Sequence, residues 1–246
     1  MKNQSPQSPV EKLAAEPSPL ARRVFDEVDS ATLSDEIYSA LREGLMIGEW
    51  LPGAKITARS VAKHCNTSLT PARDAMTRLA NEGGLLLSET RMYSVPSLTA
   101  EDYNEVMKIR LVLEPMAAEQ ATPFLSDEDI AELERTNESM RGFIENDQLQ
   151  AGLIMDSRLH LNLYRSCGSN VLWQVINNLW LRIGPTRNML SKSYRKGLSG
   201  YENHKLILNA LKDRDAGLSG RLIRRDLKQG AKKLETALRE QSEILL

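Results

Sequence analysis

The stretch from residue 56 to residue 87 constrains the fold of this chain more than any other. Two short helical patterns flank the dipeptide Cys65-Asn66. Asn66 suits a tight turn because asparagine tolerates a left-handed backbone, and Thr67 or Ser68 can cap the helix that follows. The spacing therefore predicts a helix-turn-helix. Its apolar positions are Ile56, Val61 and Ala62 on the first helix and Ala72, Ala75, Met76 and Leu79 on the second.

The outward positions of this stretch are basic. Residues 55–78 hold five lysines and arginines against the single acid Asp74, in a chain with a formal net charge of −1. A basic island on a nearly neutral protein indicates contact with phosphates, and hydroxyls and arginines at the start of a second helix are typical of readers of the major groove. A plain helical hairpin with a solvated charged face is the alternative that the pattern leaves open.

Residues 33–96 resemble the winged helix of the GntR family in its FadR-type branch. Leu51-Pro52-Gly53 and the segment from Thr70 to Arg73 carry this resemblance. The family usually has an arginine where this chain has Leu69, and a glycine where it has Met92. The resemblance implies that double-stranded DNA is contacted by Arg59, Thr67, Ser68, Thr70, Arg73 and, in the wing, Arg91.

The contents of hydrophobic residues (41%) and charged residues (26%) are typical of a globular protein. The abundance of helix-forming Leu, Ala, Glu and Arg predicts a mainly helical fold. We expect a flexible arm over residues 1–30, a winged helix-turn-helix over 31–97 and a helical effector-binding and dimerisation domain over 98–246. The last domain should be an antiparallel bundle. The two cysteines form no CxxC motif, and no apolar run is long enough for a membrane span, so a cytoplasmic protein is predicted. Helices are expected near residues 99–121, 126–146, 148–166, 169–192, 201–212 and 215–243.

Asp156 and His160 lie four residues apart on one of these expected helices, which places them on one face. His204 lies on a later expected helix and Asp226 on the one after it, and a bundle can bring all four side chains to one point. Two imidazoles and two carboxylates suit a divalent ion such as Zn, Ni or Mn. A simple hydrogen bond between Asp156 and His160 is the alternative reading of the same spacing.

From Leu98 onward the chain is similar to the FCD domain of the same regulators, through residues 109–121, 155–170 and 201–215. That domain often binds a metal through one Asp and three His, which match Asp156, His160 and His204, with Asp226 at the position of the fourth. It also binds small carboxylates beside the metal. The resemblance points Arg110 into this pocket, although an ion pair with Glu114 is the other reading. Further candidates for the pocket are Arg182 and Arg187.

Together these features predict a homodimeric transcription regulator, usually a repressor in this family, that a small organic acid releases from its operator. The rival hypothesis is a metal-dependent helical enzyme acting on small organic acids through the same four ligands. It leaves the basic face without a role, and no nucleophile or general base can be named for it. A third hypothesis is a metal or ligand sensor that binds DNA without a small-molecule inducer.

Overall fold

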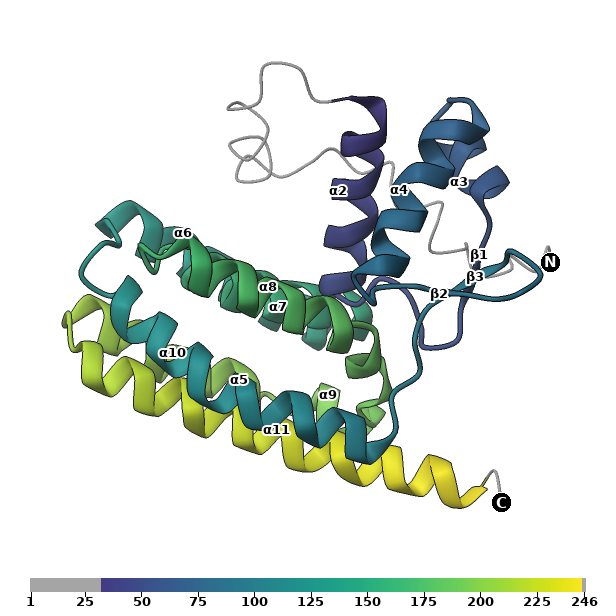
Figure 1. Cartoon of the computed structure of the whole chain (residues 1–246). Coiled ribbons are helices and arrows are strands. Elements are labelled where there is room, and N and C mark those ends of the chain that lie inside the picture. The colour runs from purple at the N-terminus through teal and green to yellow at the C-terminus, as the bar shows by residue number, and fades with distance from the viewer. Residues whose placement is uncertain (1–31, 245–246) are drawn as a thin grey trace. The chain divides into compact units, whose positions relative to one another are not determined.

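A computed structural model describes residues 32–244 (Figure 1). The expected arm over residues 1–30 lies outside this range. The chain forms two compact units, the first comprising residues up to Gly44 together with Gly53–Pro96, the second comprising Leu45–Pro52 together with the chain from Ser97 onward. We call them the winged-helix unit and the bundle unit. The helix-turn-helix and the helical bundle expected from the sequence are both confirmed.

The winged-helix unit is built on α2 (Leu33–Met46), α3 (Ala58–His64) and α4 (Leu69–Asn81). α3 begins with a capping box in which Thr57 and Ser60 satisfy each other's backbone N–H groups. Asn66 adopts the left-handed conformation that the turn requires, with φ 50°. The core of the winged-helix unit is formed by Ile37, Leu41, Val61, Ala62, Ala72, Ala75, Met76 and Leu79.

A three-stranded antiparallel sheet in the order β1–β3–β2 forms the wing. β2 (Leu86–Leu87) and β3 (Tyr93–Ser94) form a hairpin, and β1 (Lys55–Ile56) pairs with the other edge of β3. The assignment of Ile56 to the first helix of the motif was therefore wrong. Its side chain is buried from a strand opposite Tyr93, since the helix begins only after the Thr57 cap.

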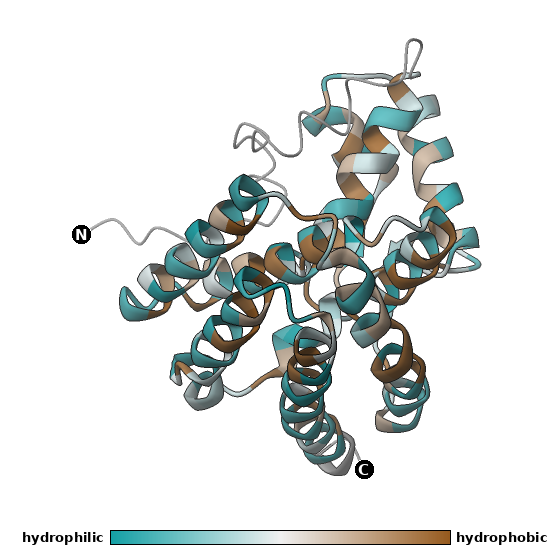
Figure 2. Cartoon of the chain, turned by 90° about the vertical axis from the view of Figure 1, so that its left-hand side faces the viewer, coloured by the Kyte–Doolittle hydropathy of each residue, from teal (hydrophilic) through white to brown (hydrophobic). Residues whose placement is uncertain are grey.

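The bundle unit contains six long helices: α5 (Ala100–Ala121), α6 (Asp127–Glu145), α7 (Leu149–Arg165), α8 (Asn170–Ile183), α10 (Ser199–Lys212) and α11 (Ala216–Ile244). Capping boxes at Thr99 and Ser126 open α5 and α6. α5 and α11 run antiparallel, because Asn104 bonds to Glu235 at one end and Thr122 to Ser219 at the other. Figure 2, in which hydrophobic residues are brown, shows them mainly on the sides of the helices that face one another.

The helix expected over residues 169–192 is broken, which corrects the sequence prediction. α8 ends at Ile183, and a 3-10 turn η2 (Pro185–Met189) and the short helix α9 (Lys192–Lys196) follow. A Cβ at Gly184 would lie 2.2 Å from the carbonyl oxygen of Leu45 and 2.5 Å from that of Met46, so the backbones meet at van der Waals distance. Asn188 then donates to the carbonyl oxygens of Gly48 and Trp50 at 2.8 and 3.1 Å. These contacts hold Leu45–Pro52 in the bundle unit.

Candidate functional site

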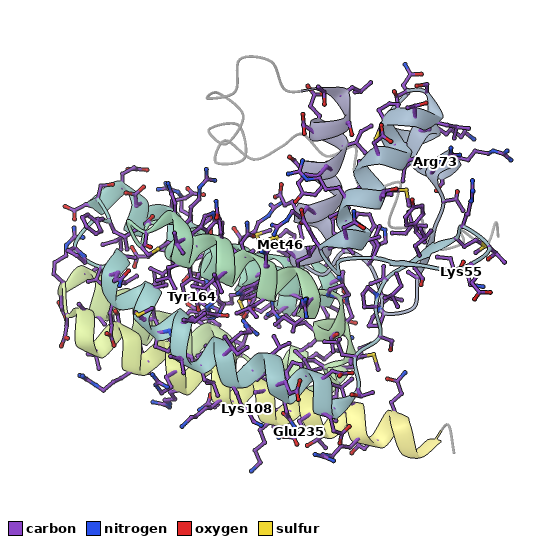
Figure 3. The ribbon with its side chains drawn as sticks, in the orientation of Figure 1. Met46, Lys55, Arg73, Lys108, Tyr164 and Glu235 are labelled. Carbon is purple, nitrogen blue, oxygen red and sulfur yellow. The ribbon has the colours of Figure 1, made fainter. Side chains whose placement is uncertain are left out.

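The two helices of the motif present a basic face to solvent. Arg59 on α3 and Arg73 on α4 are exposed, and among the described residues neither has an ion-pair partner. Figure 3 shows Arg73 pointing away from α4. Ser68 is the N-cap of α4, but its side chain makes no capping hydrogen bond, and Thr70 is exposed one residue into the helix. Both hydroxyls are thus available to an external acceptor or donor, as at a DNA backbone.

The other two expected DNA contacts differ in position. Thr67 is half-buried beside the turn. Arg91 is exposed at the tip of the wing, where its φ is 58° and its backbone N–H closes the turn onto Ser88. Nothing in these positions conflicts with contact to a duplex.

Arg78, which the sequence places on the same basic face, has a structural role instead. Its guanidinium lies 3.7 Å from the centre of the Tyr38 ring and forms ion pairs with Asp35 at 3.2 Å and Glu82 at 3.6 Å. Tyr38 in turn donates to Glu82. The side chain therefore joins α4 to α2, and the free basic charge near the turn is smaller than a count along the sequence suggests.

Within the bundle unit, the four side chains predicted to hold a metal come together. The Nε2 atoms of His160 and His204 lie 3.3 Å apart. Asp156 Oδ1 lies 3.4 Å from Nε2 of His204, and Asp226 Oδ2 lies 3.3 Å from Nε2 of His160. Both histidines are almost fully buried. Asp156 and His160 make no direct hydrogen bond, so the alternative reading of their spacing does not describe the structure.

The outer nitrogens of both histidines are already engaged. His204 Nδ1 lies 3.0 Å from Asn137 Oδ1, and the amide of Asn137 is oriented because its nitrogen donates to the carbonyl oxygen of Tyr201. His204 Nδ1 therefore carries the proton and Nε2 a lone pair. His160 Nδ1 lies 3.0 Å from the hydroxyl of Tyr164, which Figure 3 shows between the helices of the bundle. Sequence reasoning found neither Asn137 nor Tyr164, since their role depends on packing between helices.

The donor set fits a divalent ion. Ligands held 2.0–2.1 Å from a tetrahedral centre lie roughly 3.3 Å from one another, close to the separations observed between the two imidazoles and Asp156. The ligand atoms of Asp156, His160 and His204 all lie within 4.8 Å of one another, and Asp226 is not part of this group. Asp226 lies beside His160 at the edge of this group of three ligands. Its other carboxylate oxygen accepts a hydrogen bond from Asn203 at 2.9 Å.

The charges in this cluster are coupled. Burial opposes ionisation of Asp226, but the hydrogen bond with His160 outweighs it and holds the pKa of Asp226 well below its usual range. Burial likewise disfavours charged His160, yet the Asp226 contact and the charge of Asp156 raise its pKa. At His204 burial dominates and the pKa is lowered. His160 is thus the imidazole that takes a proton more readily, while His204 favours the neutral form that metals bind.

The two arginines expected to face the effector are already paired. Arg110 binds both carboxylate oxygens of Glu114 and lies 4.5 Å from the ring centre of Trp180, so the ion pair that the sequence left open is formed. Arg187 binds Asp156 and Ser157. Both arginines line the pocket described below, but neither presents a free guanidinium to it. Arg182 is exposed on α8 and does not line that pocket.

A pocket of about 100 Å³ lies inside the bundle unit beside this cluster. Its polar wall includes Asp156, His160 and Asp226, and most of its remaining surface is apolar. Binding sites for small ligands have this character, mostly apolar with a few convergent polar groups. The pocket is therefore able to hold an organic molecule whose polar end meets the metal-ligand cluster.

A DNA-reading motif joined to a helical domain with a ligand pocket defines a ligand-responsive transcription regulator. Comparison with known proteins makes the assignment specific: residues 33–91 match the model of bacterial regulatory proteins of the gntR family, and residues 105–229 match the FCD domain. The chain belongs to the GntR family of regulators that carry an FCD domain. It is a DNA-binding transcription regulator and not an enzyme.

Two relatives and one solved structure illustrate this membership. The HTH-type transcriptional regulator McbR of Escherichia coli K12 is 28% identical over 186 residues, covering 75% of this chain and 84% of McbR. The gluconate operon transcriptional repressor of Bacillus licheniformis is 25% identical, covering 76% and 79%. The solved structure of E. coli McbR/YncC superposes with a TM-score of 0.77 at 26% identity, covering 83% of this chain and 98% of that one.

Proposed function

We propose that the protein is a homodimeric repressor that a small carboxylate, bound beside a divalent metal, releases from its operator. The observation that carries this proposal is the pair of histidine Nε2 atoms facing each other at 3.3 Å beside Asp156 and next to an internal pocket. The matched relatives include a named repressor, which supports the direction of control.

On the DNA side, α4 is the recognition helix. Arg59 and Arg73 contact the duplex, Ser68 and Thr70 bond to phosphates or base edges, and Thr67 supports them beside the turn. Arg91 reaches the DNA from the wing. The support for this assignment is that the charged members of the set are exposed and lack ion-pair partners within residues 32–244, whereas Arg78 is tied to α2.

On the ligand side, Asp156, His160 and His204 hold Zn, Ni or Mn, and Asp226 acts through His160 or as a more distant fourth ligand. The metal supplies the positive charge that an incoming carboxylate needs. This follows from the pairing of Arg110 with Glu114 and of Arg187 with Asp156, which leaves neither arginine free. Arg187 then positions Asp156, because it engages Oδ2 while Oδ1 faces His204.

A second copy of the chain pairs with α5 and α8. Ile109, Val112 and Met116 recur at three and four residues along α5 and are 48%, 58% and 38% exposed, which places three apolar side chains on one solvent-facing stripe. Val175 is likewise an exposed apolar residue of α8, which packs against α5. A two-fold dimer through this surface would match an operator of two half-sites.

We place the protein in the cytoplasm, where its operator DNA is. No helix within residues 32–244 combines the length and apolar character that crossing a membrane requires.

Fluorescence anisotropy with labelled fragments from the regions beside the protein's own gene tests the proposal. The wild type should bind one fragment in the nanomolar range at moderate salt, and binding should weaken when metal and a carboxylate are added together. Arg73→Ala should weaken specific binding at least tenfold and reduce the salt slope by about 2 per dimer if each arginine neutralises one phosphate. Arg224→Ala is the matched control, because Arg224 is an exposed arginine on α11 of the bundle unit, outside the proposed DNA-contacting set. Equal affinities for wild type and Arg73→Ala would refute the assignment of α4.

A further inference from the structure

We infer that the effector is an amphipathic acid with an unbranched apolar tail of medium length, and not a short polyacid. The inference rests on the proposed function, since it takes the acid group to sit at the metal-ligand cluster. It goes further by assigning the rest of the pocket to a hydrocarbon chain. Three helices that line the pocket change from polar to apolar side chains along their length.

Two of these helices change from polar to apolar in the same direction. Along α5, the pocket is lined by Arg110, then Met107 one turn earlier, then Tyr103 one turn earlier again. Along α11 it is lined by Asp226, then Gly230 and Leu234. The helices are antiparallel, because Asn104 Nδ2 donates to Glu235 Oε1 at 2.9 Å beside the apolar end. Both walls therefore become apolar as they leave the metal-ligand cluster toward the same end of the bundle.

The opposite wall follows the same order. α7 contributes Asp156, then Leu153, then Leu149, each about one turn farther from the cluster. Leu149 packs with Met140 and Ile144 of α6 in a buried apolar cluster whose members all line the pocket. We call the space between these walls the apolar arm. Its polar lining residues other than Tyr103 belong to α9 and the residues that follow it, namely Tyr194, Arg195 and Ser199.

Glycines keep the arm open. A Cβ at Gly200 would lie 3.2 Å from Met140 Cε and 3.7 Å from Asp156 Oδ1, so Gly200 lies where the cluster meets the arm. At Gly230 the nearest atom to an added Cβ is the Tyr194 hydroxyl at 3.9 Å. A side chain at either position would occupy the space of a ligand. In an exposed helix the same glycine would only cost stability relative to alanine.

The dimensions set the ligand class. From Asp226 to Leu234 is eight residues of helix, about 12 Å, which an extended acyl chain of about ten carbons spans. A chain of this kind gains from the apolar side chains that α5, α6, α7 and α11 contribute to the arm. A polyacid such as citrate would bring further carboxylates against Leu149, Ile144 and Leu234, which offer no hydrogen bonds to offset their desolvation. Arg195, which also lines the arm, could pair with one of these carboxylates and would leave the others unpaired.

Isothermal titration of the full-length, zinc-loaded protein with straight-chain monocarboxylates tests this inference. From acetate through butanoate and hexanoate to octanoate, Kd should fall about fourfold per methylene until the arm is full. Succinate and citrate should bind more weakly than octanoate. An affinity independent of chain length, or citrate binding more tightly than octanoate, would overturn the inference.

Two variants locate the chain in the arm. Gly230→Leu should abolish the gain from hexanoate to octanoate while acetate binding is retained. Gly142→Leu on α6 is the matched control, because an added Cβ there meets nothing within 4 Å and Gly142 does not line the pocket. If Gly230→Leu does not fold, Gly230→Ala should still shorten the preferred chain. Retained chain-length dependence in Gly230→Ala or Gly230→Leu would contradict the inference.

The failure of this inference can be told from that of the proposed function. Chain-length-dependent binding that leaves the operator complex intact in anisotropy would uphold the ligand class and refute effector release. Release by acetate or citrate with no preference for octanoate would uphold the proposed function and refute the apolar tail.

Discussion

The ion pair between Arg110 and Glu114 allows a quantitative test of how the bundle is built. Glu114 is completely buried and Arg110 is 4% exposed, with Nε and NH2 of the arginine donating to the two carboxylate oxygens. Glu114→Gln keeps an acceptor but removes the charge that compensates the guanidinium. Leaving one buried charge unpaired costs about 3–5 kcal/mol. With a urea m-value of about 2.5 kcal/mol/M, the unfolding midpoint should fall by about 1–2 M.

Tryptophan fluorescence during a urea titration at fixed protein concentration measures this loss. All three tryptophans, Trp50, Trp173 and Trp180, belong to the bundle unit, so the signal reports on that unit. The double variant Arg110→Met with Glu114→Leu removes both charges and should recover most of the lost stability. A cost below about 1 kcal/mol for Glu114→Gln, or a double variant less stable than Glu114→Gln, would show that Arg110 does not depend on its ion pair with Glu114. Arg110 would then again be a candidate to bind the effector.

Three further outcomes are expected. Asn66→Ala should lower the stability of the winged-helix unit by about 1 kcal/mol while Asn66→Gly is tolerated, since φ is 50°; equal losses in thermal unfolding by circular dichroism would contradict this. Arg78→Ala should cost about 1 kcal/mol of stability and leave the salt slope of DNA binding unchanged, the reverse of Arg73→Ala, and a reduced slope would return Arg78 to the DNA-contacting set. Removing metal with a chelator should lower the free energy of unfolding of the wild type by about 2.7 kcal/mol relative to the protein with free metal at 100 times Kd. The same treatment should leave the stability of His204→Gln unaffected. A wild type whose stability does not change would argue against the metal site.

Local patterns along the sequence predicted the helix-turn-helix and the bundle, because both depend on spacing within one element. Asn66 at the turn is an example, since its left-handed backbone follows from the residue type and the tightness of the turn. β1 was missed because two residues carry no alternation, and Ile56 becomes a strand residue only through its pairing with Tyr93. The end of α8 at Ile183 is marked in the sequence by Gly184-Pro185, because Pro185 has no N–H to continue the helical hydrogen bonds.

The candidate metal site shows the same division. Asp156 and His160 could be paired from their spacing on one helix, and His204 and Asp226 could be added from their positions on later helices of a bundle, with support from the family resemblance. The groups that orient them could not, because Asn137 reaches His204 across 67 residues of sequence. The pairing of Arg187 with Asp156 across 31 residues was equally invisible, and it decides that Arg187 has no free charge for a ligand.

The segment Leu45–Pro52 has a consequence for protein engineering. It is the end of a helix and a turn from the N-terminal half, but its packing partners are Gly184 and Asn188 of the bundle unit. The chain therefore crosses between the units three times, after residues 44, 52 and 96. A hybrid regulator spliced only at residue 97 would inherit a foreign turn opposite Gly184. Grafts of new DNA specificity onto this scaffold should keep residues 45–52 with the recipient and exchange the two flanking pieces around them.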